Sequence, residues 1–81
     1  MRLSVIIVNY NVRHFLEQAL LSVQRAMEGI DGDIWVVDNN SADGSTEMVR
    51  EKFSDVHLIE NKENTGFSVA NNQAIKASKG D

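Results

Sequence analysis

The stretch that decides the fold is Leu3-Ser4-Val5-Ile6-Ile7-Val8-Asn9-Tyr10-Asn11, near the amino end of the chain. Residues 5–8 form an unbroken β-branched run without polar alternation, which is typical of a strand buried on both faces of a parallel sheet. The polar residues that follow mark the end of that strand. We therefore predict a first strand over residues 3–8, with Asn9, Tyr10 and Asn11 in the loop after it.

Beyond this strand the hydrophobic pattern alternates between helix and strand. From Val12 to Met27 apolar residues recur every three or four positions, which indicates a helix, and Asn11 is its expected cap. The same patterns predict a strand over residues 34–37, a helix over 44–53 capped by Asp43, a strand over 56–59, and a helix over 66–78 with Gly80 just past its end. This order predicts an α/β fold: a βαβαβα, three-stranded parallel sheet with flanking helices and right-handed crossovers.

The length of 81 residues limits the chain to one domain or less. Three parallel strands leave two open edges, which proteins normally pair or cover. The last predicted helix has the place of a crossover to a fourth strand, and the sequence stops where that strand would begin. We therefore expect residues 1–81 to be the truncated front portion of an α/β domain, and we expect its open edge to favour self-association.

Composition excludes several classes of function. A net charge of −4 and a pI near 5.0, with no run of Lys and Arg, exclude nucleic acid as the main partner. The chain has no cysteine, so it has no disulfide framework and no thiolate metal site. Apolar runs such as residues 5–8 are far below the roughly 20 residues that cross a bilayer. We expect no membrane segment in this chain and a cytoplasmic location.

Asparagine is concentrated where the predicted strands end. Six of the eight asparagines follow strands: Asn9, Asn11, Asn39, Asn40, Asn61 and Asn64. Because ligands of open α/β sheets bind outside the carboxyl ends of the strands, these clusters indicate one binding site. The alternative for any single residue is that Asn favours turns and caps. The loop after the first strand has no glycine, so neither the G-x-G-x-x-G fingerprint nor the P-loop is present.

Three motifs closely resemble the opening of the family-2 glycosyltransferases, in particular their rhamnosyltransferase-like branch. The motifs occupy residues 4–11, 36–45 and 64–72, reading SVIIVNYN, VVDNNSADGS and NTGFSVANN. Their order and spacing extend the resemblance over essentially the whole chain. The resemblance implies the GT-A fold, a Rossmann-like nucleotide-binding domain of which this chain would be the incomplete front half.

The resemblance also implies which residues bind a nucleotide-sugar. Tyr10 would lie against the base, and Asp38 with Asn39 would bond to base or ribose. Asn64 and Gly66 would lie near the ribose or diphosphate. The remaining expected members of the nucleotide-sugar site are Asn9, Asn11, Ser41 and Asn72, the last of which would line the same cleft.

The activity implied is transfer of a sugar, with inversion, from a UDP- or dTDP-type nucleotide-diphospho-sugar donor to a saccharide or lipid-linked acceptor. Such enzymes act in cell-wall or polysaccharide biosynthesis, at the inner face of the membrane. The divalent cation expected for the full-length enzyme, Mn²⁺ or Mg²⁺, and the catalytic base would be held beyond residue 81. We therefore expect no catalytic residue and no metal ligand here, and an inactive fragment. The alternative is a non-catalytic α/β nucleotide-binding or interaction module.

Overall fold

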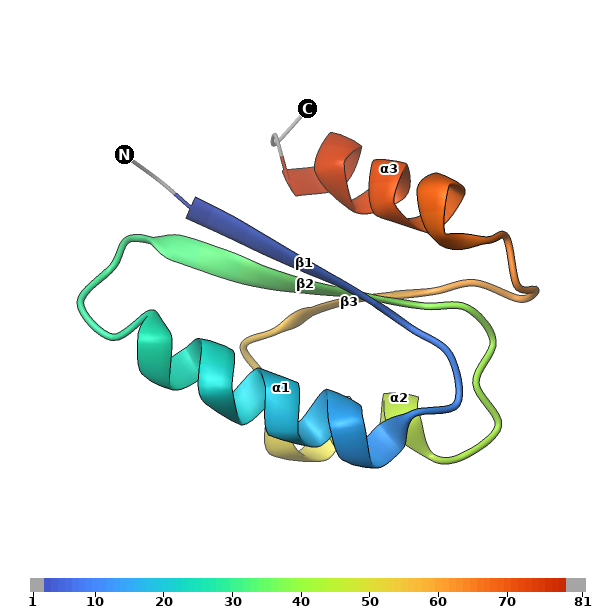
Figure 1. The fold of residues 1–81 in the computed structure, drawn as a ribbon, viewed down its shortest axis with the longest axis horizontal. Coiled ribbons are helices and arrows are strands. Elements are labelled where there is room, and N and C mark those ends of the chain that lie inside the picture. Colours follow the sequence, from blue (N-terminus) through green and yellow to red (C-terminus); the bar gives the residue numbers. More distant parts are fainter. Residues whose placement is uncertain (1–2, 79–81) are drawn as a thin grey trace.

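The strands and helices occur in the predicted order. The computed structural model describes residues 3–78. The elements are β1 (Leu3–Asn9), α1 (Arg13–Ala26), β2 (Gly32–Asp38), α2 (Ser45–Lys52), β3 (His57–Glu60) and α3 (Phe67–Ser78) (Figure 1). The strands are parallel and lie in the order β1-β2-β3. The predicted fold is thus confirmed, although the third strand lies one residue later than expected and the second extends over residues 32–38 where 34–37 was predicted. Asn9, predicted in a loop, is the last residue of β1. The predicted helix stop at Gly80 lies outside the described residues.

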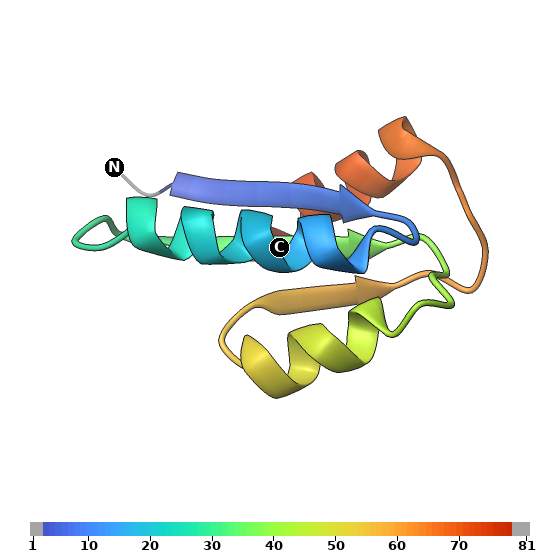
Figure 2. The ribbon, with the colours of Figure 1, turned by 60° about the horizontal axis from the view of Figure 1, so that its bottom comes forward.

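The helices cover both faces of the sheet. Helices α1 and α2 lie together on one face, and α3 lies on the opposite face, over β1 and β2 (Figures 1 and 2). The chain therefore changes faces after β3. In open parallel sheets the ligand crevice forms at the carboxyl ends of the strands, where the winding reverses. The loops after β1, β2 and β3 are the part of the molecule where this geometry predicts a site.

Strand β2 separates two apolar cores because successive side chains point to opposite faces. The larger core lies against α1 and α2 and contains Leu16, Leu20, Ile34, Val36, Met48, Val49, Phe53 and Val56. In the smaller core Val37 packs on Ala70 and Ala74, and all three are 0% exposed. The two alanines have no bulk that would hold α3 away from the sheet. Close approach of α3 fixes where its first turn lies relative to the strand ends.

Strand β1 is less buried than its sequence predicts. Ile7 packs on the larger core while Ile6 and Val8 pack on the smaller one, so the strand does face apolar groups on both sides. Residues 4–8 are nevertheless only half-buried. The reason is that β1 is an edge strand among residues 3–78 and has a neighbour on one side only. A β-branched run indicates apolar contacts on both faces of a strand. It does not indicate whether the strand is paired on one edge or on both.

Candidate functional site

The three strand ends are brought together by backbone hydrogen bonds that continue past the sheet. The Asn39 amide donates to the Asn9 carbonyl over 2.9 Å, and the Asn61 amide donates to the Asp38 carbonyl over 2.8 Å. The loops after β1, β2 and β3 therefore begin side by side. This confirms that the asparagine clusters seen in the sequence converge on one edge of the sheet.

A buried polar cluster, formed by Asn9, Asp38 and Ser41, joins the ends of β1 and β2. Asn9 Nδ2 donates to Asp38 Oδ1 over 2.9 Å and to Ser41 Oγ over 3.2 Å, and the Ser41 amide donates to Asp38 Oδ2 over 2.8 Å. Asn9 and Asp38 are 1% and 2% exposed. Because both carboxylate oxygens of Asp38 accept a hydrogen bond, the charge is held at a fixed place at the strand ends.

One acceptor in this cluster is left without a donor. Asn9 Oδ1 is buried, and no donor within residues 3–78 reaches it. The amide cannot simply be turned over, since its Nδ2 already donates to the Asp38 carboxylate. An unpaired buried acceptor costs about 1–3 kcal/mol, so native proteins seldom keep one without a partner. The cluster thus has capacity for a donor that comes from outside the described residues.

Asn11 does not cap α1, contrary to the sequence prediction. The residue before the helix is Val12, without a side-chain cap, and Asn11 has a positive φ of 51°. Its Oδ1 instead accepts from the Ala42 amide over 2.7 Å, while its own amide donates to Ser41 Oγ over 2.8 Å. Asn tolerates the left-handed conformation, which here turns its side chain toward the neighbouring loop. Asn11 therefore ties the loop after β1 to the loop after β2.

Asp43 takes the role expected of Asn11 and serves two helices. Its Oδ2 accepts from the Arg13 amide at the start of α1 over 2.9 Å. Its Oδ1 accepts from the amide of Ser45 over 3.1 Å and from the Ser45 hydroxyl. The N-cap of α2 is Gly44 and not Asp43 as predicted, but the Asp43 carboxylate, one residue earlier, bonds to the first residue of the helix. Burial raises the pKa of Asp43, but the hydrogen bonds from Ser45 and Arg13 lower it more, so the pKa lies below its ordinary value.

We expect Asp43→Ala to lower the free energy of unfolding by about 0.5–2 kcal/mol at neutral pH, the usual effect of removing a helix cap. Because the folded state lowers the pKa of Asp43, its contribution is complete above the unfolded pKa near 3.8 and is lost as pH falls through the folded value. Urea unfolding at pH 7 and pH 2.5 should show the difference from wild type shrinking in acid. Asp31→Ala, at an exposed aspartate, is the control; an equal deficit at both pH values would contradict the expectation.

A second cluster joins the end of β2 to the loop that leads into α3. Asn39 is 2% exposed, and its Nδ2 donates to the Gly66 carbonyl over 3.3 Å. Its Oδ1 accepts from Asn61 Nδ2 over 2.9 Å and from Thr65 Oγ1 over 3.1 Å. Both ends of the Asn39 amide are therefore engaged within the protein. Its predicted contact with base or ribose stays a prediction.

Asn64 and Gly66 form the turn that opens α3. Asn64 Oδ1 accepts from the Gly66 amide over 2.9 Å, and Gly66 has a φ of 82°. That conformation favours glycine, because a side chain would be strained there whatever space surrounds it. The turn leaves the free N–H groups of the first turn of α3 at the same edge of the sheet as the two polar clusters. A helix amino end of this kind attracts negative charge.

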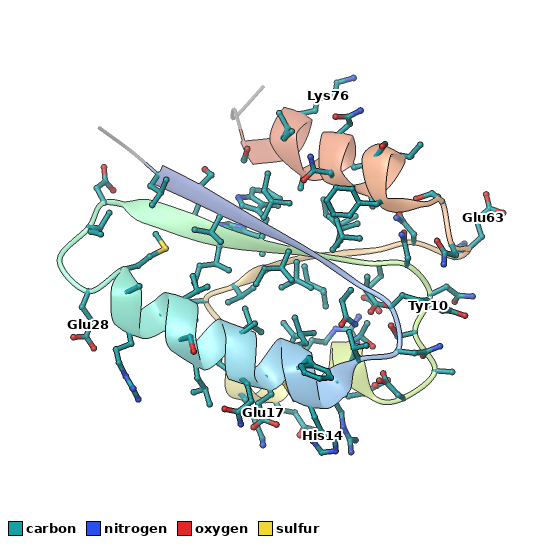
Figure 3. The ribbon with its side chains drawn as sticks, in the orientation of Figure 1. Tyr10, His14, Glu17, Glu28, Glu63 and Lys76 are labelled. Atoms are coloured by element: carbon teal, nitrogen blue, oxygen red, sulfur yellow. The ribbon has the colours of Figure 1, made fainter. Side chains whose placement is uncertain are left out.

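Tyr10 and Asn72 are two of the exposed members of the predicted site. Tyr10 is 49% exposed in the loop after β1, and it lies at the same end of the molecule as Glu63 of the loop after β3 (Figure 3). Asn72 is exposed on α3, and within residues 3–78 it makes no hydrogen bond to the other predicted site residues. Hydrogen bonds thus link Asn9, Asn11, Asp38, Asn39, Ser41, Asn64 and Gly66, with Tyr10 in the loop between Asn9 and Asn11, and Asn72 is not part of this network within residues 3–78.

Sequence reasoning missed Thr65 and Gln73, and it noted Asn61 without assigning it to the site. Gln73 exchanges two hydrogen bonds with Asn61, of 2.9 and 3.1 Å. A signal for Gln73 is present in the sequence. It lies three positions after Ala70 and directly before Ala74, so it is a polar residue beside the buried stripe of α3.

Two kinds of feature are absent from residues 3–78. No three His, Asp or Glu side chains come together as they would to hold a metal ion. Nor does this part of the chain contain a helix with the length and apolar character to pass through a membrane. The site that is described consists of neutral amides and hydroxyls around one buried carboxylate.

Comparison with known proteins identifies a family and two relatives that match this sequence. The model of the family described as glycosyl transferase family 2 matches residues 4–81. The chain is 36% identical over 83 residues to the uncharacterized glycosyltransferase YfnE of Bacillus subtilis, and 35% identical over 83 residues to the dolichol-phosphate mannosyltransferase of Pyrococcus furiosus. Each match covers 100% of this chain but only 21% and 24% of the respective relative. No solved structure matches the chain significantly.

Proposed function

Because this chain belongs to glycosyl transferase family 2, we propose that it forms the nucleotide-sugar-binding part of a larger glycosyltransferase, within the amino-terminal half of a GT-A, Rossmann-like domain. The observation that carries the proposal is the buried cluster of Asn9, Asp38 and Ser41 at the strand ends, with one acceptor unfilled. A nucleoside offers the matching donors, namely an imide N–H and ribose hydroxyls. A sheet edge of this type is also where α/β proteins hold nucleotides.

In this proposal each loop contacts a different part of the donor. The exposed ring of Tyr10 stacks on the base. Asp38 uses two of its roughly four acceptor positions internally and retains capacity for an imide or a ribose hydroxyl. The turn of Asn64 and Gly66, with the amino end of α3, faces the ribose and the diphosphate. Asn11 and Ser41 hold the loop of Tyr10 in place, and Asn72 lines the cleft from α3.

The donor is a UDP- or dTDP-sugar, and the acceptor is a saccharide or a lipid-linked group. The name of the Pyrococcus furiosus relative combines dolichol phosphate with mannosyl transfer, which supports a lipid-linked acceptor. A location at the inner face of the membrane is a further part of the proposal. Inverting transfer in cell-wall or polysaccharide synthesis is part of the same proposal.

The chemical step of the proposed transferase needs a divalent cation and a base, and we expect both to be held beyond residue 81. A cation such as Mn²⁺ or Mg²⁺ would neutralise the leaving diphosphate, and a base would take the acceptor proton. Residues 3–78 bring no metal-ligand group together, so they do not fit the cation by themselves. The part of these residues is to bind and orient the donor. We expect the 81-residue chain alone to be inactive as a transferase.

The test is calorimetric titration of the full-length parent protein with UDP and dTDP, each with and without Mn²⁺ or Mg²⁺. We expect at least one nucleotide to bind, and to bind more tightly with the cation. GDP and ADP serve as comparison ligands. Absence of binding by every nucleotide would overturn the proposed function.

Tyr10→Ala distinguishes a donor site from a module that merely keeps the fold. Stacking of a base on an aromatic ring contributes about 1–3 kcal/mol, so nucleotide affinity should fall roughly tenfold or more. Phe15→Ala, at a residue that is 79% exposed on α1, is the matched control and should bind as wild type does. Titration of both variants in parallel checks this. Unchanged affinity in Tyr10→Ala favours the non-catalytic module instead.

A further inference from the structure

A chain of three amide side chains runs from the end of β2 to the middle of α3. We call Asn39, Asn61 and Gln73 the amide clasp. Asn61 Nδ2 donates to Asn39 Oδ1 and to Gln73 Oε1, both over 2.9 Å, and Gln73 Nε2 donates back to Asn61 Oδ1 over 3.1 Å. The clasp therefore closes the segment from residue 61 to residue 73 on itself and fastens it to β2.

Each amide of the clasp uses at least two of its four hydrogen-bonding positions within the protein. Both N–H groups of Asn61 are donated, and Asn39 Oδ1 accepts from both Asn61 and Thr65. An amide oxygen has two lone pairs, so no acceptor position is left on Asn39 Oδ1. The orientation of each amide is thereby fixed by its neighbours. Loss of one member leaves part-buried groups of the others unpaired.

The clasp encloses the turn that opens α3. Asn64 and Gly66 lie between Asn61 and Gln73 in the sequence, and the Gly66 carbonyl is itself bonded by Asn39 Nδ2. The loop from residue 62 to 66 is otherwise polar and largely exposed. Without the clasp it would have many conformations, and ordering it would oppose ligand binding.

We propose that Asn61 and Gln73 are positioning residues of the donor site: they hold the Asn64–Gly66 turn at a fixed place relative to Asp38 and contact no part of the donor. This inference rests on the proposed function. The clasp acts by ordering the turn before the donor arrives, so it changes how tightly the donor binds. It does not change the rate of transfer once the donor is in place.

The first experiment compares Gln73→Leu with wild type in the full-length parent protein. Leucine has nearly the size of glutamine and suits a helix, but it removes both bonds to Asn61. We expect the donor KM and the nucleotide Kd to rise about tenfold, with kcat at saturating donor within about twofold of wild type. Lys76→Leu, at an exposed site one turn further along α3, should leave both constants unchanged. A fall in kcat without a rise in KM, or equal behaviour of the two variants, overturns the proposal.

The second experiment needs no ligand. Hydrogen exchange of the Gly66 amide, which donates to Asn64 Oδ1, reports whether the turn is held. In Gln73→Leu we expect this amide to exchange about tenfold faster, while Lys76→Leu exchanges as wild type does. Unchanged protection of Gly66 refutes the clasp even where no nucleotide binds, whereas faster exchange in a protein that binds no nucleotide confirms the clasp and refutes only the proposed function.

Discussion

Replacement of Asp38 by alanine is expected to reduce nucleotide affinity roughly 10- to 150-fold, which corresponds to the 1.5–3 kcal/mol of a hydrogen bond to a charged group, and to destabilise the fold. The carboxylate is 2% exposed and accepts from Asn9 Nδ2 and from the Ser41 amide. Without it, one buried side-chain amide and one backbone amide lose a charged partner. We expect the free energy of unfolding to fall by about 3 kcal/mol, because each unsatisfied buried group costs about 1–3 kcal/mol. An 81-residue chain has roughly 4–12 kcal/mol in total.

Asp38→Asn separates the charge from the shape. Its amide keeps one acceptor oxygen but turns an N–H toward either Asn9 Nδ2 or the Ser41 amide, both of which are donors. We therefore expect a loss of affinity close to that of Asp38→Ala. The control is Asp55→Ala. Asp55 is exposed, and its carboxylate accepts a long hydrogen bond of 3.5 Å from Gln24 Nε2. Titration and urea unfolding are the measurements; affinity within threefold of wild type in Asp38→Asn would contradict the role given to the charge.

The fold could be predicted from the sequence because its determinants are local. The β-branched run before Asn9 indicates a buried strand. The spacing of apolar residues by three and four after Val12 indicates a helix with one buried face. Parallel pairing then follows from the order of the elements, since helices between strands require crossovers. The convergence of the asparagine clusters follows in turn, because parallel strands all end at one edge. No long-range contact has to be known for any of these steps.

The hydrogen-bond partners within the site could not be predicted in this way. Asn11 lies two residues before α1, yet its side chain accepts from the Ala42 amide, and the first amide of α1 donates to Asp43 instead. Partners some 30 residues apart in sequence depend on how two loops lie side by side, and hydrophobic periodicity carries no information on that. The partner of Gln73 could not be predicted either. A polar residue beside the buried face of α3 indicates that a hydrogen-bond partner exists, but not that the partner is Asn61.

Order in the proposed donor site therefore depends on the helices on both faces of the sheet. The loops after β1 and β2 are tied to α1 and α2 through Asp43, and the loop after β3 is tied to α3 through Gln73. Since α1 and α3 lie on opposite faces of the sheet, each side of the site is set by a different core (Figure 1). A change in the larger core should therefore act on the site through the stability of the whole chain, and not through the clasp.

Leu20→Ala is the sharpest test of the larger core. Leu20 is 0% exposed on α1, and truncation of such a leucine costs about 3–5 kcal/mol through lost burial and the cavity that remains. That loss is a quarter or more of the roughly 4–12 kcal/mol expected for the whole chain, so a substantial unfolded population should appear at a lower urea concentration than in wild type. Leu21→Ala makes the same chemical change at the next residue, which is 46% exposed, and should cost less than about 1 kcal/mol.

Urea unfolding measures the difference in the free energy of unfolding between the two variants. Nucleotide titration of Leu20→Ala shows whether the lost stability also changes nucleotide affinity. If the larger core acts only through global stability, the folded fraction falls while the affinity of each folded molecule stays as in wild type. The number of binding sites per chain then drops without a change in the intrinsic constant. A weaker intrinsic nucleotide affinity in Leu20→Ala would instead mean that the packing of α1 affects the positions of Asp43 and of the loop of Tyr10. Equal losses in the free energy of unfolding for Leu20→Ala and Leu21→Ala would contradict the assignment of Leu20 to the larger core.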